Sequence, residues 1–455
     1  MAEARRFHAP LAWVGGRWAR DVLLVAGADG SWQEVREGCP AAGRAGAETL
    51  AGPALPGIVD AHSHAFQRAM AGLAERSAPG HDDFWSWRDR MYAVALRITP
   101  PQLEAIAAFL YAELLAAGYT QVCEFHYLHN EPGGQPYADP LEMSLALVRA
   151  AQQAGIGLTL LPTLYMRSGF GAAGLRPDQC RFASTPESVL RIAQAVRQSA
   201  TPLLTAGIAL HSLRAVDEAA LRESAAEAKA GAMPVHIHVA EQQQEVQDCL
   251  QHHGLRPIEW LLRHAPPDAQ WNLVHATQAS AAELQAVQRS GASIVLCPTT
   301  EANLGDGVFD LPAWLAAGGT WTIGSDSHVT RSWSEELRLL EYSQRLVLRQ
   351  RNVAARAGAR EGTAATLLQG ALGGASAAAG LPLGGLAVGQ RADFIVPDMA
   401  TPALAGVGDE HLLDALVFSS PGARMQRVVV AGRDVQLAPP TARFVQAMRQ
   451  LWQAA

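Results

Sequence analysis

The central part of the chain alternates between short apolar runs and longer stretches with helical spacing. Each run is rich in β-branched residues and ends in polar or ionisable ones, which is typical of a buried strand that carries functional groups at its end. The helical stretches include residues 101–118, 217–230 and 279–290, and Gly291 follows the last of them in a C-cap position. Eight runs follow one another: PGIVDAHSHAF from Pro56, YTQVCEFHYL from Tyr119, GIGLTLLPTLY from Gly155, TAGIALHSL from Thr205, MPVHIHVAEQ from Met233, WNLVHATQ from Trp271, ASIVLCPTTEANL from Ala292 and TWTIGSDSH from Thr320.

This repeat of eight strand–helix units predicts an α/β fold, a (β/α)8 TIM-type barrel over residues 56–381. An open doubly wound sheet is the alternative, but it would need a glycine-rich phosphate-binding turn that we do not find. The ionisable residues lie at the C-terminal ends of the runs, where barrel enzymes place their active sites. This agreement favours the barrel.

The two ends of the chain have a different pattern. Residues 1–55 contain short apolar pieces such as LAWVGGRWA and DVLLVAG, and residues 382–442 contain ADFIVPD and MQRVVVAGRDVQ, separated by Gly, Ala and Pro. We expect both segments to pack together as one small β-domain beside the barrel. Residues 443–455 are expected to form a C-terminal helical tail.

Composition narrows the class of protein. Hydrophobic residues make up 49% and charged ones 17%, which indicates a well-packed globular chain. The net charge of −7 gives no basic surface for nucleic acid, and no apolar run is long enough to span a membrane. The N-terminal sequence is too interrupted by charge and Gly for a signal peptide. The 5 cysteines are widely spaced and lack a C-x-x-C pair, so we expect neither disulfides nor a cysteine zinc site, and a reduced cytoplasm as the compartment.

Histidines two positions apart end the first run. His62 and His64 would point to the same face of a strand, so their imidazoles can converge on one point. Neutral imidazole is a preferred ligand of zinc and similar divalent ions. Alone the pair indicates little, because two polar residues at a strand end are also an ordinary finding.

Further candidate ligands end other runs. The fifth run carries His236 and His238 and is followed by Glu241, the sixth ends at His275, and the eighth ends at Asp326. A single histidine on an apolar strand is usually a satisfied core residue, but this many at strand ends favour one shared site. Three histidines and an aspartate with one position left for water form a sensible catalytic metal site. A bound ion lowers the pKa of water from about 15.7 to about 7, and Glu241, His275 and Asp326 are the candidate acids and bases.

The motifs PGIVDAHSHAF, HVAEQ, LVHA and GSDSH together resemble the amidohydrolase superfamily, over nearly the whole chain. The resemblance implies a metal-bearing barrel and a β-sandwich formed from both termini. It implies that His62 and His64 are the ligands of strand one, His238 that of strand five, and Asp326 the ligand and base of strand eight. His238 is preferred to its neighbour two residues earlier because it stands three before Glu241, as in the H-x-A-E pattern.

The remaining catalytic roles also follow from the resemblance. Glu241 matches the acid that shuttles protons, and His275 the histidine that steers or polarises the attacking water. Members with two metals commonly bridge them with a carboxylated lysine on strand four. Lys229, the only lysine of this chain, lies in a helical stretch, so we expect one ion, as in the deaminase branch. Zinc suits these ligands best, and iron, manganese or cobalt would also fit.

Local sequences narrow the branch further. HSHAFQRAMAGL, FWSWRDRMY, CEFHYLHN, LHSLRAV and HVAEQQQEV are similar to the branch that hydrolyses N-formimidoyl-L-glutamate to N-formyl-L-glutamate and ammonia in histidine degradation. Arginines suit such a dicarboxylate because they form bidentate pairs with carboxylates. By resemblance, the substrate contacts are Gln67, Arg88, Tyr127, His211 and Arg214.

Plainer interpretations stand beside these. Arg88 could simply pair with Asp83 or Asp89 on a solvated helix, and the nearby Phe84, Trp85 and Trp87 are expected to pack as a lid rather than to stack on substrate. We assign no role to Cys297 or to the TTEANLG turn, and His328 could support the ligands from behind. Six further histidines are expected in loops or on the surface: His81, His126, His129, His252, His253 and His264.

Two alternative functions remain open. The first is an aminohydrolase of a purine or triazine ring, which would need groups that read ring edges and no paired arginines. The second is a catalytically inactive amidohydrolase-like scaffold, which the complete set of ligands and acids disfavours. The expected partners are a small dicarboxylate substrate and, from the habit of the family, a second copy of the chain in a homodimer.

Overall fold

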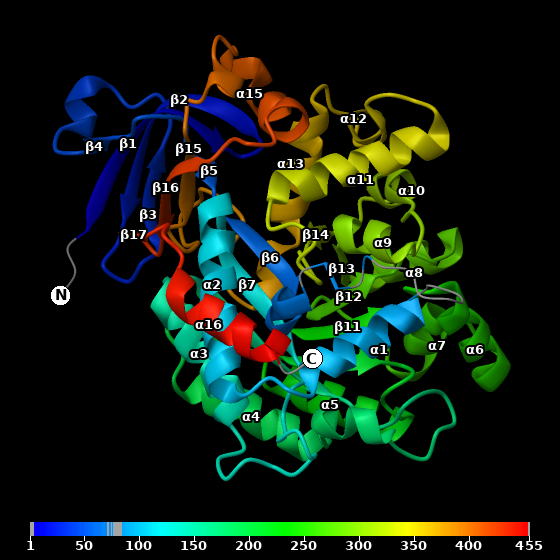
Figure 1. The fold of residues 1–455 in the computed structure, drawn as a ribbon. Helices are drawn as coiled ribbons and strands as arrows, with labels where there is room; N and C mark the ends of the chain where they lie inside the picture. The colour runs from blue at the N-terminus through cyan, green and yellow to red at the C-terminus, as the bar shows by residue number, and fades with distance from the viewer. Residues whose placement is uncertain (1–3, 71, 74, 76–83, 454–455) are drawn as a thin grey trace.

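Eight parallel strands form the barrel in the middle of the molecule (Figure 1). The computed structural model describes residues 4–70, 72, 73, 75 and 84–453. The eight predicted runs all become barrel strands, and the short β9 (Leu204–Ala206) pairs with the N-terminal part of the third of them. In spatial order the strands are β6 (Ile58–Ser63), β7 (Tyr119–His126), β8 (Gly157–Leu164), β10 (Ile208–Ser212), β11 (Val235–Val239), β12 (Trp271–His275), β13 (Ser293–Leu296) and β14 (Trp321–Ile323).

The first and last strands close the barrel. A parallel bridge joins Ser63 to Asp326, and the Asp326 backbone N–H donates to the His62 carbonyl at 2.8 Å. The His64 N–H in turn donates to the Asp326 carbonyl at 3.2 Å. The predicted α/β barrel is therefore confirmed, and its last hydrogen bonds run between residues that carry candidate chemistry.

Helices surround the barrel, and local sequence signals explain where they begin and end. In α8, Ser280 caps the N-terminus by accepting from the Glu283 N–H, and the Glu283 carboxylate accepts from the Ser280 N–H. Gly291 ends that helix with a φ of 82°, as predicted. The main outer helices are α2 (Pro100–Ala117), α3 (Glu142–Ala154), α4 (Pro186–Gln198), α5 (Glu218–Ala230), α6 (Gln243–His253), α7 (Pro257–His264), α8 (Ala281–Ser290) and α11 (Trp333–Leu348).

Shorter helices complete the barrel domain. Two segments between β6 and α2 lie over the C-terminal ends of the strands: the 3-10 helix η2 (Ala65–Met70) and α1 (Phe84–Ala95). A further 3-10 helix, η3 (Pro177–Phe182), lies between β8 and α4. The remaining short helices are α9 (Pro298–Leu304), α10 (Leu311–Ala316), α12 (Val353–Ala357), α13 (Thr363–Gly373) and α14 (Ala375–Ala379).

Both termini contribute to two antiparallel sheets beside the barrel. One contains β3 (Trp32–Arg36), β2 (Arg17–Ala26), β1 (Arg5–Val14) and the parallel β4 (Glu48–Thr49). The other contains β17 (Arg433–Asp434), β16 (Met425–Val430), β15 (Phe394–Pro397) and β5 (Leu55–Pro56). The pairing of β5 with β15 joins the two ends of the chain, as expected.

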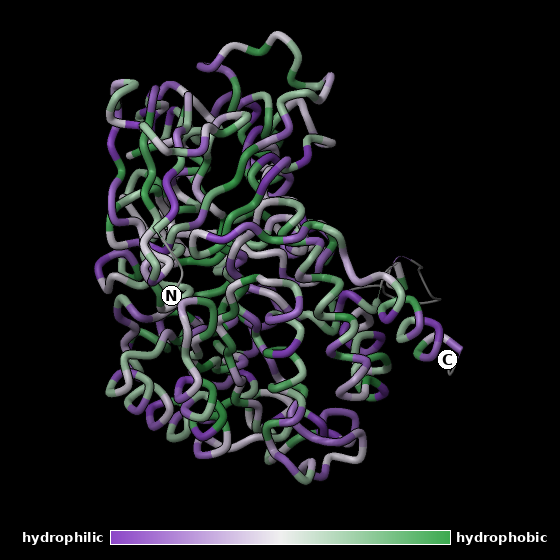
Figure 2. Tube along the Cα trace, turned by 90° about the vertical axis from the view of Figure 1, so that its left-hand side faces the viewer, coloured by the Kyte–Doolittle hydropathy of each residue, from purple (hydrophilic) through white to green (hydrophobic). Residues whose placement is uncertain are grey.

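An apolar core lies between these two sheets. The Phe394 ring from the second sheet contacts Phe7 and Trp32 from the first, at centroid distances of 5.0 and 6.1 Å. Figure 2 shows hydrophobic positions running through the strands and hydrophilic ones spread over the outer turns. The sandwich of both termini is thus confirmed. Its limits at residues 55 and 382, and the start of a tail at residue 443, stay predictions.

The last helix returns to the barrel. α16 (Thr441–Gln453) packs against α2, and the Phe109 and Phe444 rings stack at 4.0 Å. Among the described residues, no helix is both long and apolar enough to cross a bilayer.

A buried arginine ties the sandwich to the barrel end opposite the candidate site. Arg391 pairs with Asp393 at 2.6 Å and donates to the Gln121 side-chain oxygen at 2.7 Å. It also donates to the carbonyls of Thr120 and Pro202, both at 3.0 Å. These partners precede or begin strands, so the guanidinium holds the N-terminal ends of the barrel strands against the second sheet.

Replacement of this arginine should destabilise the whole fold. Arg391→Ala removes the cation beside the buried Asp393 carboxylate and the donor of three oxygen acceptors, which should lower the free energy of unfolding by about 3–5 kcal/mol in urea titrations. The matched change is Arg149→Ala, because Arg149 pairs with Glu104 at 2.7 Å but is 44% exposed. That change should cost less than about 1 kcal/mol. Equal losses for the two variants would contradict the role given to Arg391.

Candidate active site

Four predicted ligands meet at the C-terminal end of the barrel. The Nε2 atoms of His62 and His238 are 3.0 Å apart, and Asp326 Oδ1 lies 3.5 and 3.4 Å from Nε2 of His62 and His64. Ligand atoms that each lie about 2.0–2.1 Å from one ion are about 3.3 Å from each other in a tetrahedron. The spacing of these atoms therefore fits a single divalent ion. The excluded alternative, His236, lies two residues nearer the N-terminal end of β11, where it contacts the Ala378 carbonyl of α14 at 2.9 Å instead of the cluster.

The protons on these imidazoles are placed to leave metal-binding lone pairs. Nδ1 of His64 faces the Phe125 carbonyl and Nδ1 of His238 faces the His211 carbonyl, both at 2.9 Å. A carbonyl can only accept, so each Nδ1 carries the proton and each Nε2 presents a lone pair to the cluster. Burial and the neighbouring imidazoles lower the pKa of His62 and His238 well below the ordinary value, which favours the neutral ligand form.

The backbone around the cluster is unusual. His275 and Asp326 have φ angles of 70° and 48°, a left-handed conformation that residues other than glycine seldom adopt. Such conformations concentrate at functional sites, where the surrounding structure imposes them. Gly324 explains part of the constraint, because a Cβ there would lie 2.8 Å from the backbone N and O of His62. The close approach of β14 to β6 therefore requires glycine at this position.

The two remaining catalytic candidates face the cluster. His275 Nε2 lies 3.9 Å from Glu241 Oε1 and 3.8 Å from Asp326 Oδ2. Burial raises the pKa of Glu241, although the charges of His275 and Arg214 oppose it. Burial lowers the pKa of His275, but the negative charge of Glu241 and the hydrogen bond with Glu301 outweigh it and raise that pKa to about 10. A carboxyl and an imidazole with such shifts can pass protons beside the metal site.

Sequence reasoning missed two carboxylates that hold these groups. Glu301, on α9, lies 3.3 Å from His275 Nδ1 and accepts from the Cys297 N–H at 3.0 Å. Glu245, on α6, accepts from the N–H groups of Ala240 and Glu241, both at 3.1 Å. Glu301 belongs to the TTEANLG turn, to which we assigned no role. Its position soon after a predicted barrel strand could have identified it as a candidate site residue.

A buried polar network lies behind the ligands. Asp60 accepts from the N–H and hydroxyl of Ser325 at 2.8 and 2.6 Å, and that hydroxyl lies 3.0 Å from His328 Nδ1. Ser63 lies 3.3 Å from the other nitrogen of His328 and donates to Glu124 at 2.6 Å. These bonds link the residues next to the ligands across β6, β7 and β14. His328 therefore supports the ligand-bearing backbone rather than lining the pocket.

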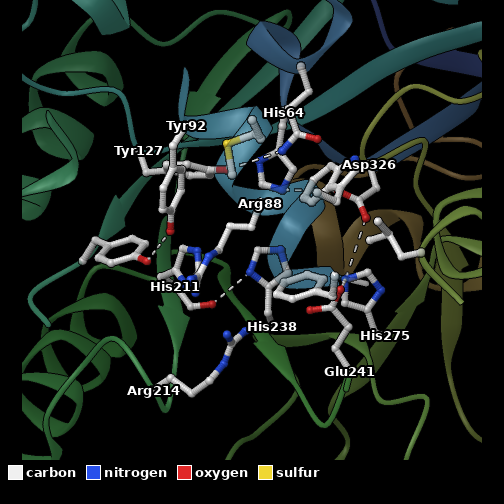
Figure 3. A pocket seen from close by; sticks show the side chains of 16 residues that line it. His64, Arg88, Tyr92, Tyr127, His211, Arg214, His238, Glu241, His275 and Asp326 are labelled. Atoms are coloured by element: carbon white, nitrogen blue, oxygen red, sulfur yellow. Dashed lines mark hydrogen bonds and ion pairs between the residues drawn. The ribbon is translucent and has the colours of Figure 1, made fainter. Parts of the chain in front are cut away.

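A pocket opens over this cluster (Figure 3). On one side it is lined by candidate metal ligands and candidate acids and bases, including His64, His238, Glu241, His275 and Asp326. All predicted substrate contacts line it too: Gln67, Arg88, Tyr127, His211 and Arg214. Gln67 Nε2 lies 3.4 Å from the Tyr127 hydroxyl, and the side-chain oxygen Oε1 of Gln67 has no partner among the described residues.

Two arginines reach the pocket from different elements. Arg88 comes from α1 and Arg214 follows β10, and Arg214 is only 9% exposed. The Nε atom of Arg214 is buried and has no hydrogen-bond partner among the described residues. Burial lowers the pKa of Arg214, but Glu245 and Glu241 outweigh it, so it stays charged. An anionic ligand is the natural complement of such a site.

Arg88 also lies near Asp89, the partner that the plainer interpretation of the sequence gave it. Its Nη2 lies 3.7 Å from Asp89, whose side chain is 62% exposed, so the ion pair is weak. Asp83 lies outside the described residues. The Trp85 ring supports both arginines at 4.6 and 5.5 Å, a cation–π arrangement. Phe84 and Trp87 line the pocket itself, so the aromatic cluster both packs under the arginines and borders the ligand space.

Other sequence expectations had mixed outcomes. Lys229 is an ordinary surface charge, 72% exposed and paired with Asp268 at 2.9 Å. His126 and His129 were expected in loops or on the surface. For His126 this is wrong, because it is the buried last residue of β7. His129 does lie in the loop after β7, although it is buried there. His252 is exposed and His253 and His264 are half-buried, whereas His81 lies outside the described residues.

Two pocket residues, Tyr92 and Tyr165, and the glutamine that binds them were not singled out from sequence. Tyr92 and Tyr165 line the pocket, and Gln179 donates to both of their hydroxyls. Tyr165 ends the third predicted run, where the strand-end rule would have found it. Tyr92 stands four residues after Arg88 on the same face of α1, which was a second available signal.

Known proteins share this architecture and much of the sequence. A formimidoylglutamate deiminase from Pseudomonas aeruginosa is 49% identical over 420 residues, which cover 91% of each chain. The solved structure of an amidohydrolase from Brucella melitensis is 41% identical, covers 98% of this chain and 100% of its own, and superposes with a TM-score of 0.89. An adenosine deaminase from Xanthomonas campestris, solved with bound zinc, is 23% identical, covers 99% and 98% of the two chains, and has the same fold with a TM-score of 0.79. The sequence model of the amidohydrolase family matches residues 54–435, and the chain belongs to that family.

Proposed function

We propose that this chain hydrolyses N-formimidoyl-L-glutamate to N-formyl-L-glutamate and ammonia. The observation that carries the proposal is the pair of arginines, Arg88 and Arg214, in one pocket with a cluster fit for a metal ion. Two cations at one wall suit a substrate with two carboxylates, and the ring of a purine or triazine offers them nothing to pair with. The relative from Pseudomonas aeruginosa, named for this reaction, supports the same assignment.

The metal site belongs to the proposal as well. His62, His64, His238 and Asp326 would hold one divalent ion, and zinc is the best match for three nitrogens and one oxygen. When bound, the ion lowers the pKa of a coordinated water to about 7 and so supplies a nucleophile at neutral pH. The one lysine of the chain is far from the cluster on α5, which supports a single ion.

The side chains around the cluster then handle the protons. Water adds to the formimidoyl carbon, and Glu241 carries its proton to the terminal imino nitrogen, which becomes an amine. Glu241 then moves the proton of the added hydroxyl group to that amine, whose bond to carbon breaks as the C=O bond of the formyl group forms and ammonia leaves. His275, 3.9 Å from Glu241 and 3.8 Å from Asp326, lies where it can polarise the water and stabilise the charge that develops on oxygen.

The rest of the substrate is held on the other side of the pocket. Arg88 and Arg214 pair with its carboxylates, and His211, Gln67 and Tyr127 contact it between those arginines and the metal ligands. The homodimer and the reduced cytoplasm stay predictions from the sequence.

A substrate comparison tests the proposed function. Ammonia release should be rapid with N-formimidoyl-L-glutamate and negligible with guanine and cytosine. The same sample, purified without a histidine tag, should contain about one divalent ion per chain, since the ligands form one site. Turnover of a ring without turnover of formimidoylglutamate would contradict the substrate. Metal-free protein without activity after zinc is added would favour an inactive scaffold.

Glu241→Gln should separate proton transfer from metal binding. The amide has the shape of the carboxylate but cannot take a proton from water, so kcat should fall by about 10²- to 10⁴-fold. Metal content should not change, because Glu241 is not among the clustered ligand atoms. We would measure turnover and bound metal on one sample. A variant with full turnover would remove Glu241 from the mechanism.

Arg88→Ala and Arg214→Ala should chiefly weaken substrate binding. Each removes hydrogen bonds to a charged group, worth about 1.5–3 kcal/mol, so KM should rise about 10- to 100-fold with a smaller change in kcat. Arg149→Ala, on the outer helix α3, is the control for loss of an arginine elsewhere. If both pocket variants kept the KM of the parent, the pairing with carboxylates would be wrong.

A further inference from the structure

A tyrosine pair closes the pocket on the side away from the metal ligands. Tyr92 comes from α1 and Tyr165 directly follows β8, and their hydroxyl oxygens are 3.1 Å apart. Figure 3 shows Tyr92 across the pocket from His275 and Asp326. Ring contacts give the order along the wall: Tyr127 lies 5.3 Å from the ligand His64 and 6.3 Å from Tyr165. The pair is therefore beyond Tyr127 as seen from the metal cluster.

Gln179 fixes the hydrogen bonding of this pair. Its Nε2 donates to the Tyr92 hydroxyl oxygen at 3.2 Å and to that of Tyr165 at 3.0 Å. The orientation of the amide is settled by its other end, because Oε1 accepts from the Arg176 N–H at 3.0 Å. Gln179 is 0% exposed, so both of its N–H groups are committed to the tyrosines.

Counting protons leaves one hydroxyl hydrogen without an acceptor. Each tyrosine oxygen already accepts from Gln179, and one hydroxyl proton lies between the two oxygens. The other hydroxyl proton has no acceptor among the described residues. Burial raises the pKa of Tyr165 well above its ordinary value, so the phenol keeps its proton. Both side chains line the pocket, so a ligand inside it can accept this proton.

The surroundings select an anion as that acceptor. The Arg88 guanidinium lies 5.5 Å from the Tyr92 ring centroid, and Arg214 borders the same space. An oxygen that pairs with Arg88 would therefore lie within reach of the tyrosine pair. In the proposed substrate, the acceptor farthest from the reacting carbon is the side-chain carboxylate.

We propose that Tyr92, Tyr165 and Gln179 form a specificity-determining cluster that donates one hydroxyl proton to the side-chain carboxylate of the substrate. This inference rests on the proposed function, because it assigns one group of that substrate. The cluster selects ligands that place a carboxylate beside the two tyrosine hydroxyls. It leaves the reacting carbon to the residues at the metal site.

The test compares binding of two ligands that need no turnover. N-formyl-L-glutamate and N-formyl-L-norvaline have side chains of the same length, and only the first ends in a carboxylate. Calorimetry on metal-loaded enzyme gives their Kd ratio for the parent, Tyr92→Phe, Tyr165→Phe and the double variant. The preference for the glutamate derivative should fall about 10- to 100-fold in the double variant, the range for a hydrogen bond to a charged group.

Proton counting makes the single variants informative. Either one leaves a single hydroxyl that no longer needs to donate to its neighbour. Each single variant should therefore keep most of the preference of the parent, and only the double variant should lose it. In turnover of N-formimidoyl-L-glutamate the effect should appear in KM, with kcat within a few-fold of the parent. Tyr119→Phe is the matched control, because Tyr119 is fully buried at the start of β7 and its hydroxyl has no partner among the described residues.

The outcomes separate this inference from the proposed function. An unchanged ligand preference in the double variant, or an equal loss of both ligands, would overturn the role of the cluster. A parent that binds both ligands equally would overturn it as well. Failure of the parent to release ammonia from N-formimidoyl-L-glutamate would instead refute the proposed reaction, whatever the Kd ratios show.

Discussion

The hydrogen bonds between β6 and β14 carry two requirements at once. They close the barrel, and they join the backbone of His62 and His64 to that of Asp326. Because three candidate ligands lie at this seam, their relative positions are fixed by the closure of the sheet rather than by flexible loops. Gly324 permits the close approach, and the left-handed φ of Asp326 turns its side chain into the barrel. The network from Asp60 through Ser325 and His328 supports the same seam from behind.

This seam also explains why the chemistry was visible in the sequence. Strand ends of a parallel barrel converge, so histidines and carboxylates at the ends of separate runs had to meet. Side chains two positions apart on a strand point to the same face, which predicted that His62 and His64 lie together. The structure also brings His238, not His236, to the cluster. The β-sandwich could be predicted only as far as two β-rich ends; its register, including the β5–β15 pair, depends on packing between Phe7, Trp32 and Phe394.

What the sequence did not predict are contacts made through partners distant in the chain. Glu301 and Glu245 act on His275 and on the backbone of Glu241 from helices whose orientation no local pattern specifies. The burial of His126 and His129 depends on the covering of the outer face of β7, which is a tertiary effect. The same holds for Gln179, whose amide can bind the two tyrosine hydroxyls only when α1 and the end of β8 lie beside it.

The placement of α1 has a consequence for how relatives of this chain diverge. The candidate metal ligands belong to the barrel, whereas Arg88 and Tyr92 belong to a helix that lies outside the strand–helix repeat, between β6 and α2. Changes in that helix can alter which molecules are accepted without moving a strand or a ligand. Deaminases of quite different compounds can therefore keep one barrel, and selection can act on ligand choice and on reactivity almost independently.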